Sequence, residues 1–155
     1  MHVEDLLREF GRQIGLPDLA LDPSNVCHVI FDDVHDVTIE TDAERKQLYV
    51  HASIGKMPVV NKGPYYEKLL HLALFGTGLG GASAGLDPHQ GDVILWRHFT
   101  CEGLDVIAFT KAMELFLHVI STVPQSLDPL RQGDEAGPAT GTDRFGRMGQ
   151  GMIMA

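Results

Sequence analysis

The spacing of hydrophobic residues near the N-terminus predicts an amphipathic helix over residues 3–15. Glu4 and Arg8 lie one turn apart on its polar face, where their charges can pair. Gly15 and Pro17 are expected to end the helix. Its apolar residues fall at positions i, i+3, i+4, i+7 and i+11, which share one face of a 3.6-residue period: Val3, Leu6, Leu7, Phe10 and Ile14.

A different periodicity follows and predicts three strands, over residues 26–31, 36–41 and 47–54. In the second and third of these runs apolar and polar residues alternate, so one face of each strand is apolar. Short polar links ("DDVH" and "DAERK") connect the runs. Such links suit a meander of antiparallel strands.

The pattern over residues 64–76 predicts a second helix with an unusually wide hydrophobic arc. Pro64 suits the first helical position, and Gly76 suits the end. Because few polar residues interrupt residues 65–75, this helix is expected to be buried on several sides. A second copy of the chain could supply the additional cover, and a well-filled monomer core is the alternative.

The rest of the pattern completes an α+β fold. It predicts a weak strand within residues 80–87, a strong strand over 92–99 and a third helix over 102–122 that Pro124 ends. The expected order is therefore α-β-β-β-α-β-β-α, with a twisted antiparallel sheet and three helices. The third helix is also largely apolar, which again favours association.

Composition divides the chain into a folded domain, residues 1–123, and a tail, residues 124–155. The tail is rich in glycine and proline, and we expect it to be flexible and mostly disordered. Its last part, "RFGRMGQGMIMA", is either an inert end or a small docking motif.

Charge and cysteine usage exclude several classes of partner. The net charge is -9, and residues 1–123 carry nine basic and 17 acidic residues, so nucleic acid is not an expected partner. No apolar run approaches the roughly 18 residues of a membrane span, and no membrane partner is expected. Cys27 and Cys101 form no paired motif that would suggest a disulfide framework or a zinc site.

Candidate chemistry is sparse. Gly76, Gly78 and Gly81 match the G-x-G-x-x-G spacing of a dinucleotide-binding turn, but a helix is predicted before them where a strand is required. The eight histidines show no metal-binding spacing, and Cys27 and His28 are neighbours on a strand, so their side chains point to opposite faces. We therefore expect no catalytic residue, no cofactor and no metal.

The order of elements, together with several segments, resembles the class I type III secretion chaperones, the Tir-chaperone-like family. The resemblance covers residues 3–121 and is carried by "FDD…VTIE", "YVHASIGKMP", "YYEKLLHLALFG…GGASAGLDPHQGDVILWRHF" and "LDVIAFTKAMELFLHVI". Its most specific part is the second helix running into "GGASAGLD…GDVILWR", where the family has a glycine-rich link and a short strand.

The resemblance implies a cytoplasmic bacterial homodimer without enzymatic activity. Such a protein binds the N-terminal region of secreted effectors, keeps it ready for export and delivers it to the secretion apparatus. Binding would use hydrophobic patches and strand addition. The implied partners are effector proteins, a second copy of the chain and the secretion ATPase.

The resemblance also assigns two sets of residues, each of which could equally be plain core. The dimer interface would comprise Tyr66, Leu69, Leu70, Ala73, Ala82 and Ala84. The effector-binding set would comprise Leu6, Leu7, Phe10, Ile14, Val29, Phe31, Val37, Ile39, Leu48 and Val50.

Two alternatives stay open at this point. The chain could be a non-enzymatic adaptor or regulatory module that serves another partner, such as the secretion ATPase or a regulator. The long tail is also unlike many members of the family, and one subgroup that it could indicate is the export-control chaperones that serve many effectors.

Overall fold

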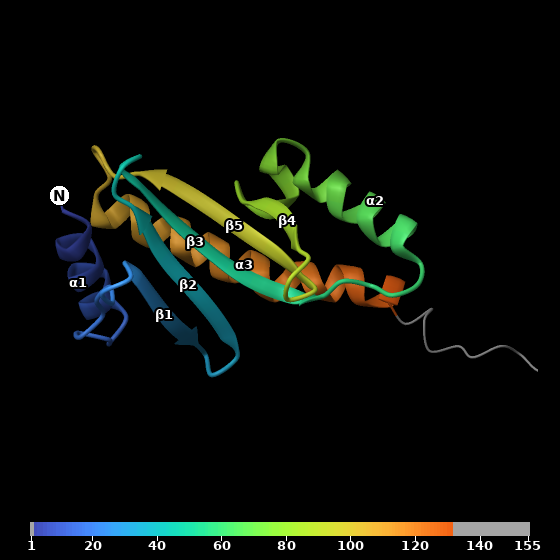
Figure 1. Ribbon diagram of the computed structural model, residues 1–155, viewed down its shortest axis with the longest axis horizontal. Coiled ribbons are helices and arrows are strands. Elements are labelled where there is room, and N and C mark those ends of the chain that lie inside the picture. The colour runs from blue at the N-terminus through green and yellow to red at the C-terminus, as the bar shows by residue number, and fades with distance from the viewer. Residues whose placement is uncertain (1, 132–155) are drawn as a thin grey trace, which may run out of the picture.

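A computed structural model describes residues 2–131, and Figure 1 shows how the elements follow one another. The observed order confirms the predicted α+β fold, with one additional 3-10 helix after the second α-helix. The elements are α1 (Val3–Gln13), β1 (Val26–Phe31), β2 (His35–Asp42), β3 (Gln47–Lys56), α2 (Lys62–Ala73), η1 (Leu74–Leu79), β4 (Ser83–Asp87), β5 (Asp92–Thr100) and α3 (Val106–Arg131).

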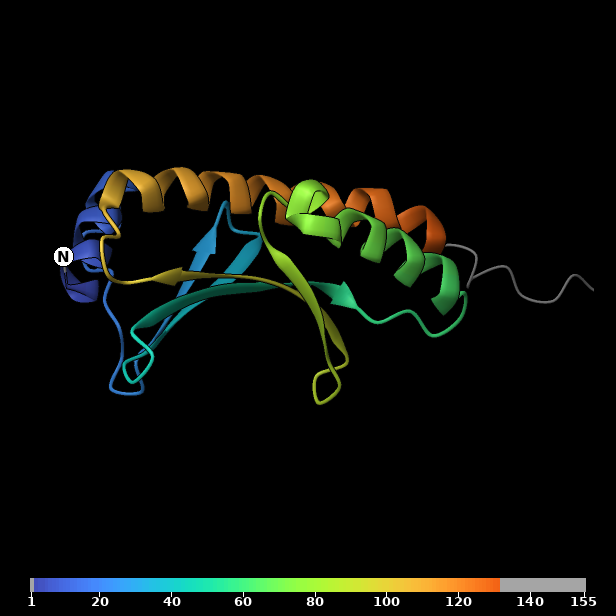
Figure 2. The same ribbon diagram turned by 90° about the horizontal axis from the view of Figure 1, so that it is seen from above.

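The five strands form one antiparallel sheet with the order β1-β2-β3-β5-β4. Consecutive hairpins join β1 to β2 and β2 to β3, whereas α2 and η1 separate β3 from the β4–β5 hairpin. Strands β1 and β4 are therefore the two edges. Figure 2 shows α1 and α3 on one side of the curved sheet, while no helix among residues 2–131 covers the other side.

The core lies between this sheet and the two helices. The alternating pattern read from the sequence places Val37 and Ile39 of β2, and Leu48 and Val50 of β3, on the helix-facing side, where all four are fully buried. The α1 residues face the same core, and Phe10 meets Phe109 of α3 edge-on at a centroid distance of 5.1 Å. The alternating pattern of the strands and the helical pattern of α1 thus place their apolar residues in the same core.

The third helix is longer than the sequence suggested. It begins at Val106 and continues through Pro124 and Pro129 to Arg131, so the expected boundary after residue 123 falls inside a helix. Proline inside a helix removes a hydrogen bond and crowds the preceding turn, at a cost of about 3 kcal/mol. Burial of Val123 and Leu127 in the core offsets this cost. The rest of the expected flexible tail, residues 132–155, lies outside the described residues.

The end of α3 is also held by α2. Nη2 of Arg131 donates a 2.7 Å hydrogen bond to Oη of Tyr65, and the guanidinium carbon lies 4.8 Å from the centre of the tyrosine ring. This pair links the last turn of α3 to the first turn of α2.

By length and composition α3 could cross a membrane, which the sequence analysis did not expect. In the fold α3 packs lengthwise along the sheet, and one side of the helix is buried there. Its buried residues are Phe109, Ala112, Met113, Phe116, Val119, Ile120, Val123 and Leu127.

The glycine-rich segment after α2 differs from the predicted helix end. Helix α2 begins two residues before Pro64 and ends at Ala73, and the chain continues as η1 through Phe75 and Gly76, both with positive φ. Gly76 is therefore not the end of α2. Gly80 and Gly81, with φ of 59° and 83°, turn the chain into β4. A helix before the glycines and a strand after them are the reverse of a dinucleotide-binding turn.

Candidate binding surfaces

A shallow apolar groove lies between α2 and β4. It encloses about 200 Å³ and is lined on the α2 side by side chains that sequence analysis assigned to a dimer interface. Leu70 keeps 67% of its surface exposed, and Phe75, just beyond α2, keeps 94%. The structure brings together five of the six assigned residues, which are Tyr66, Leu69, Leu70, Ala73 and Ala84.

The sixth assigned interface residue, Ala82, lies elsewhere. It is buried in the core just before β4 and does not line the groove. Gly85 and Leu86, which sequence reasoning did not name, line the groove beside Ala84. The signal for Leu86 was present, because it lies two residues after Ala84 and so projects from the same face of the strand.

The residues assigned to effector binding form the core of the domain. Eight of them are buried between the sheet and the helices: Leu6, Leu7, Phe10, Val29, Val37, Ile39, Leu48 and Val50. Ile14 and Phe31 are partly buried and pack against the same core. The sequence left two interpretations open for these eight residues, core or effector contact. In this fold they are core residues. A partner of the folded domain therefore has to contact their neighbours.

One such neighbouring surface lies along the free edge of β1. A groove of about 480 Å³ runs between residues 15–19 and the strand positions His28, Val29 and Ile30. Leu16 and Leu19 line it from the loop, and Ile30, with 65% of its surface exposed, lines it from the strand. Sequence reasoning missed Leu16 and Ile30, although the loop signal of Pro17 and the outward-facing register of Ile30 were readable.

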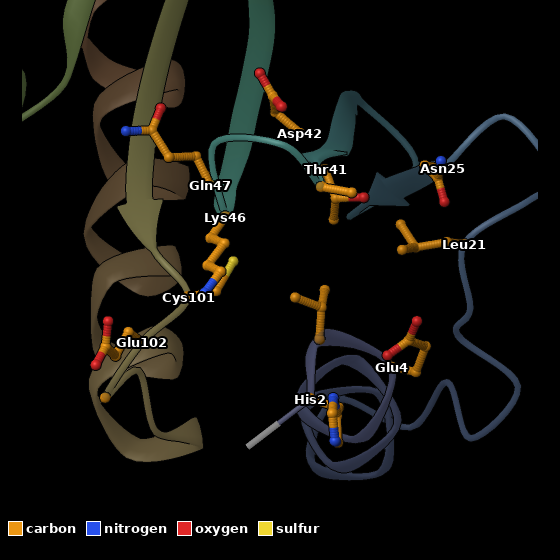
Figure 3. Close-up of a pocket in the computed structure, with 13 residues that line it drawn as sticks. His2, Glu4, Leu21, Asn25, Thr41, Asp42, Lys46, Gln47, Cys101 and Glu102 are labelled. Atoms are coloured by element: carbon orange, nitrogen blue, oxygen red, sulfur yellow. The ribbon is translucent and has the colours of Figure 1, made fainter.

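A third hollow, of about 510 Å³, lies where α1, the β2–β3 turn and the β5–α3 link meet (Figure 3). Its lining carries both signs of charge, with Glu4, Asp42 and Glu102 acidic and Lys46 basic. Cys101 also reaches this hollow, but burial raises the pKa of its thiol, so the nucleophilic thiolate is disfavoured near neutral pH. The arrangement presents a polar surface rather than a catalytic constellation.

The other cysteine is equally unreactive. Cys27 is buried in β1, and desolvation raises the pKa of its thiol. Among the described residues no group of three or more histidine, cysteine or acidic side chains is placed to hold a metal ion. The surfaces that stand out are therefore an apolar groove and a free strand edge beside a second groove, which are features of a protein-binding domain.

Comparison with known proteins assigns the class. A family model described as "Tir chaperone protein (CesT) family" matches residues 5–123. A chain of the ExsC–ExsE complex has a TM-score of 0.70 with this structure at 26% identity, covering 81% of this chain and 92% of that chain. A chain of the HopA1–SchA chaperone–effector complex has the same fold, with a TM-score of 0.68 at 23% identity, covering 79% and 93%.

The fold and these matches define a class I type III secretion chaperone. The chain belongs to the Tir chaperone protein (CesT) family. It is also 38% identical over 65 residues to the transcriptional anti-antiactivator ExsC of Pseudomonas aeruginosa. That alignment covers 42% of this chain and 45% of ExsC, so it spans less than half of either protein.

Proposed function

We propose that this protein is a homodimeric cytoplasmic chaperone that binds the N-terminal region of type III secretion effectors by non-covalent contacts and without catalysis. It keeps the bound segment ready for export and delivers it to the secretion apparatus, where the secretion ATPase is its partner. Membership of the family and the likeness to chains from chaperone–effector complexes support the effector as client. The observation that carries the proposal is the free edge of β1 beside an apolar groove.

The edge of β1 suits an extended client. Its inner side pairs with β2, and on its outer side Val26 is already bonded to Asp22 of the preceding loop. The outer backbone groups of His28 and Ile30 bond to nothing else in residues 2–131 and can pair with another strand. Strand addition takes its affinity from these backbone groups and its selectivity from pockets for alternate side chains. The groove formed by Leu16, Leu19 and Ile30 lies directly beside this edge and supplies such a pocket.

The uncovered apolar surface of α2 supports the association of two copies. Only Tyr65 and Leu69 of this helix are buried in a single copy, although the helix is apolar over a wide arc. Covering Leu70 and the groove beside β4 with the same surface of a second copy removes this apolar area from water. A dimer also doubles the number of β1 edges that one client can contact.

The test is capture of an effector segment by edge variants. Co-expression with the first hundred or so residues of a type III effector should yield a complex that purifies as one species. The double variant Leu16→Asp/Ile30→Asp should weaken capture by about tenfold or more, because charges enter the apolar pocket. Val59→Asp is the control, since Val59 is apolar, exposed and outside the groove beside β1. Equal capture by both variants would contradict binding at this edge.

A second candidate is a regulatory role, favoured by the likeness to ExsC, which carries the description of a transcriptional anti-antiactivator. In that role the same surfaces bind a regulatory protein instead of, or in addition to, an effector. Isolation of the protein's partners from the secreting cell separates the two functions. Recovery of effectors supports the chaperone, and recovery of regulators or apparatus components alone supports the second candidate.

A further inference from the structure

The sheet face opposite α1 and α3 carries a cluster of aromatic rings. Tyr49 of β3 and Trp96 and His98 of β5 lie on this face, and their ring centroids are 6.3, 6.2 and 5.9 Å apart. The cross-strand pairs Tyr49–His98 and His51–Trp96 place these side chains side by side. In residues 2–131 no helix covers them (Figure 2).

Two adjoining hollows open on this face. The smaller, about 300 Å³, is lined by Glu40, Tyr49, His51, Ile94 and Trp96. The larger, about 600 Å³, begins where β2 and β3 part beyond the Thr38–His51 pair, and it shares His51 and Ile94 with the first. Tyr49 and Trp96 form the aromatic part of this surface in the smaller hollow, and the larger hollow continues it toward β1 and the β4–β5 turn.

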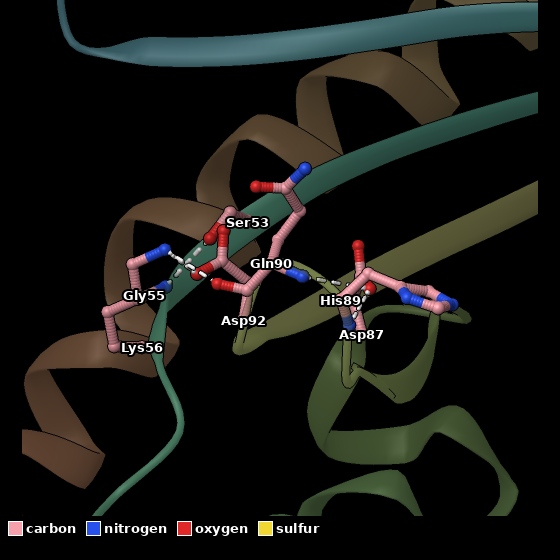
Figure 4. Close-up of polar contacts among 7 residues, drawn as sticks. All are labelled: Ser53, Gly55, Lys56, Asp87, His89, Gln90 and Asp92. Carbon is pink, nitrogen blue, oxygen red and sulfur yellow. Dashed lines mark hydrogen bonds and ion pairs between the residues drawn. The ribbon is translucent and has the colours of Figure 1, made fainter.

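The two hollows are acidic. Their lining contains four carboxylates and no lysine or arginine: Asp36, Glu40, Asp87 and Asp92. Figure 4 shows that Asp92 is already paired with Lys56, at 2.6 Å, and that Asp87 accepts hydrogen bonds from the backbone of the turn after β4. Asp36 and Glu40 lie on the same face of β2 on either side of Thr38, and Asp36 has only the imidazole of His28 beside it, at 4.0 Å. These two carboxylates are therefore the ones that have no lysine or arginine partner and can meet a cationic ligand. An aromatic surface edged by carboxylates suits a segment that combines arginine with apolar side chains.

The chain itself contains such a segment. Residues 144–155, "RFGRMGQGMIMA", carry Arg144 and Arg147, no acidic side chain, one phenylalanine, three methionines and an isoleucine. Arginine complements the carboxylates and stacks on aromatic rings, and methionine adapts to irregular apolar surfaces. This chemistry is the opposite of the domain that precedes it, whose charge is strongly negative.

The segment can also reach the hollows from the end of α3. Arg131 lies against Gly55 in β3, because a Cβ built on Gly55 would be 3.1 Å from its guanidinium. Tyr49 lies six residues along the same strand, roughly 20 Å away, and passing to the other side of the sheet adds roughly 10 Å. The twelve residues 132–143 span up to about 40 Å when extended.

We propose that residues 144–155 bind the aromatic and acidic sheet face of their own chain, with Arg144 and Arg147 toward Asp36 and Glu40 and the apolar side chains on Tyr49 and Trp96. The proposal concerns the free protein, and it holds or fails independently of effector capture at the β1 edge.

The test uses Trp96, which is the chain's single tryptophan and lies in the proposed site. In the full chain, Arg144→Glu/Arg147→Glu should shift the tryptophan emission to longer wavelength by several nanometres and raise its acrylamide quenching constant about twofold, because the ring becomes exposed to water. Arg8→Glu/Arg12→Glu is the matched control, since it makes the same charge change on exposed positions of α1. Circular dichroism verifies that both variants are folded.

A second measurement uses the synthetic peptide 144–155. Added to the Arg144→Glu/Arg147→Glu chain, it should reverse the emission shift saturably, and Glu40→Lys should weaken that titration by about tenfold. Unchanged emission in the tail variant, or an equal shift in the α1 control, would overturn the proposal. An emission shift that depends on protein concentration would overturn it in favour of the tail of a second copy. Emission that responds only when an effector segment is added would assign the face to the client instead.

Discussion

At the scale of single residues, Gly80 is the position where backbone and packing act together. Its φ of 59° is left-handed, and an added Cβ would lie 2.8 Å from Cγ of Leu115 and 3.0 Å from Cγ2 of Val119. Gly80→Ala should therefore lower the free energy of unfolding by about 2 kcal/mol, of which roughly half comes from the backbone and half from crowding against α3. Urea unfolding measures this change.

Gly15→Ala provides the comparison for this prediction. Gly15 also has a left-handed φ, of 78°, but an added Cβ would meet nothing within 4 Å. Its substitution should cost only the backbone part, about 1 kcal/mol. Equal losses of unfolding free energy in Gly80→Ala and Gly15→Ala would contradict this prediction, because they would show that the turn at Gly80 is not packed tightly against α3.

The carboxyl group of Asp92 should make the free energy of unfolding depend on pH. A hydrogen bond from Lys56 lowers the pKa of the Asp92 carboxyl, and a hydrogen bond from Ser53 acts in the same direction. Because the folded pKa is below that of the unfolded chain, near 3.8, the pair stabilises the fold above that pH and loses this effect as pH falls through the folded pKa. Asp92→Asn should therefore destabilise the protein at pH 6 and have a smaller effect at pH 3, as measured by urea unfolding.

Lys56→Met is the matching variant for this acid prediction. It removes the partner and leaves the Asp92 carboxyl in place, so it too should weaken the pH dependence between pH 6 and pH 3. High salt should reduce the wild-type effect, because the Lys56 side chain is largely exposed. A pH dependence that is the same in wild type and both variants would exclude this pair as its origin.

At the scale of elements, the last two turns of α3 are part of the folded domain. Leu127 is fully buried in the core beyond Pro124. Leu127→Ala should cost about 2–5 kcal/mol through lost apolar contacts and the cavity that remains. Gln125→Ala, two residues earlier on the exposed side of the same turn, should cost about 0.5 kcal/mol. If Leu127→Ala were as stable as Gln125→Ala, the result would favour a folded domain that ends at Val123.

The elements that sequence analysis predicted well are those with local patterns. Strand alternation in β2 and β3 and the helical spacing of α1 depend on neighbouring residues alone, and they located these elements to within a few residues. The end of α3 was predicted wrongly, because proline preference is local and burial of Leu127 depends on the distant sheet. The 3-10 helix after Ala73 was missed for a similar reason, since it rests on a left-handed Phe75 that no propensity favours.

Sequence analysis could not separate core residues from surface residues. Leu7 and Leu70 occupy equivalent positions in their helical patterns, yet Leu7 is fully buried and Leu70 is exposed. The difference arises because α1 packs against the start of α3 at one end of the molecule, whereas α2 lies at the opposite end beside β4 with one side uncovered. The resemblance grouped the residues of the α2–β4 groove, and the fold places five of them together there; their contact with a second copy stays a prediction.

At the scale of the whole molecule, dimer formation is the prediction that follows from α2. The chain has a mass of 17.0 kDa, so light scattering should give about 34 kDa for the wild type. Leu70→Glu should return the protein to the monomer mass at micromolar concentration, because the charge would be buried without a partner at the interface. Ala84→Trp should do the same by filling the groove beside β4.

Ile107→Glu is the control that makes this result specific. Ile107 is 64% exposed on α3, nearly the same as the 67% of Leu70, and it lies outside the groove. If exposed apolar side chains associate non-specifically, Leu70→Glu and Ile107→Glu should both lower the mass measured by light scattering. That result would contradict the α2 interface. If only Leu70→Glu and Ala84→Trp yield monomers, the wide hydrophobic arc of α2 is explained by a second copy of the same helix. The thermal midpoint of the wild type should then rise with protein concentration, and that of Leu70→Glu should not.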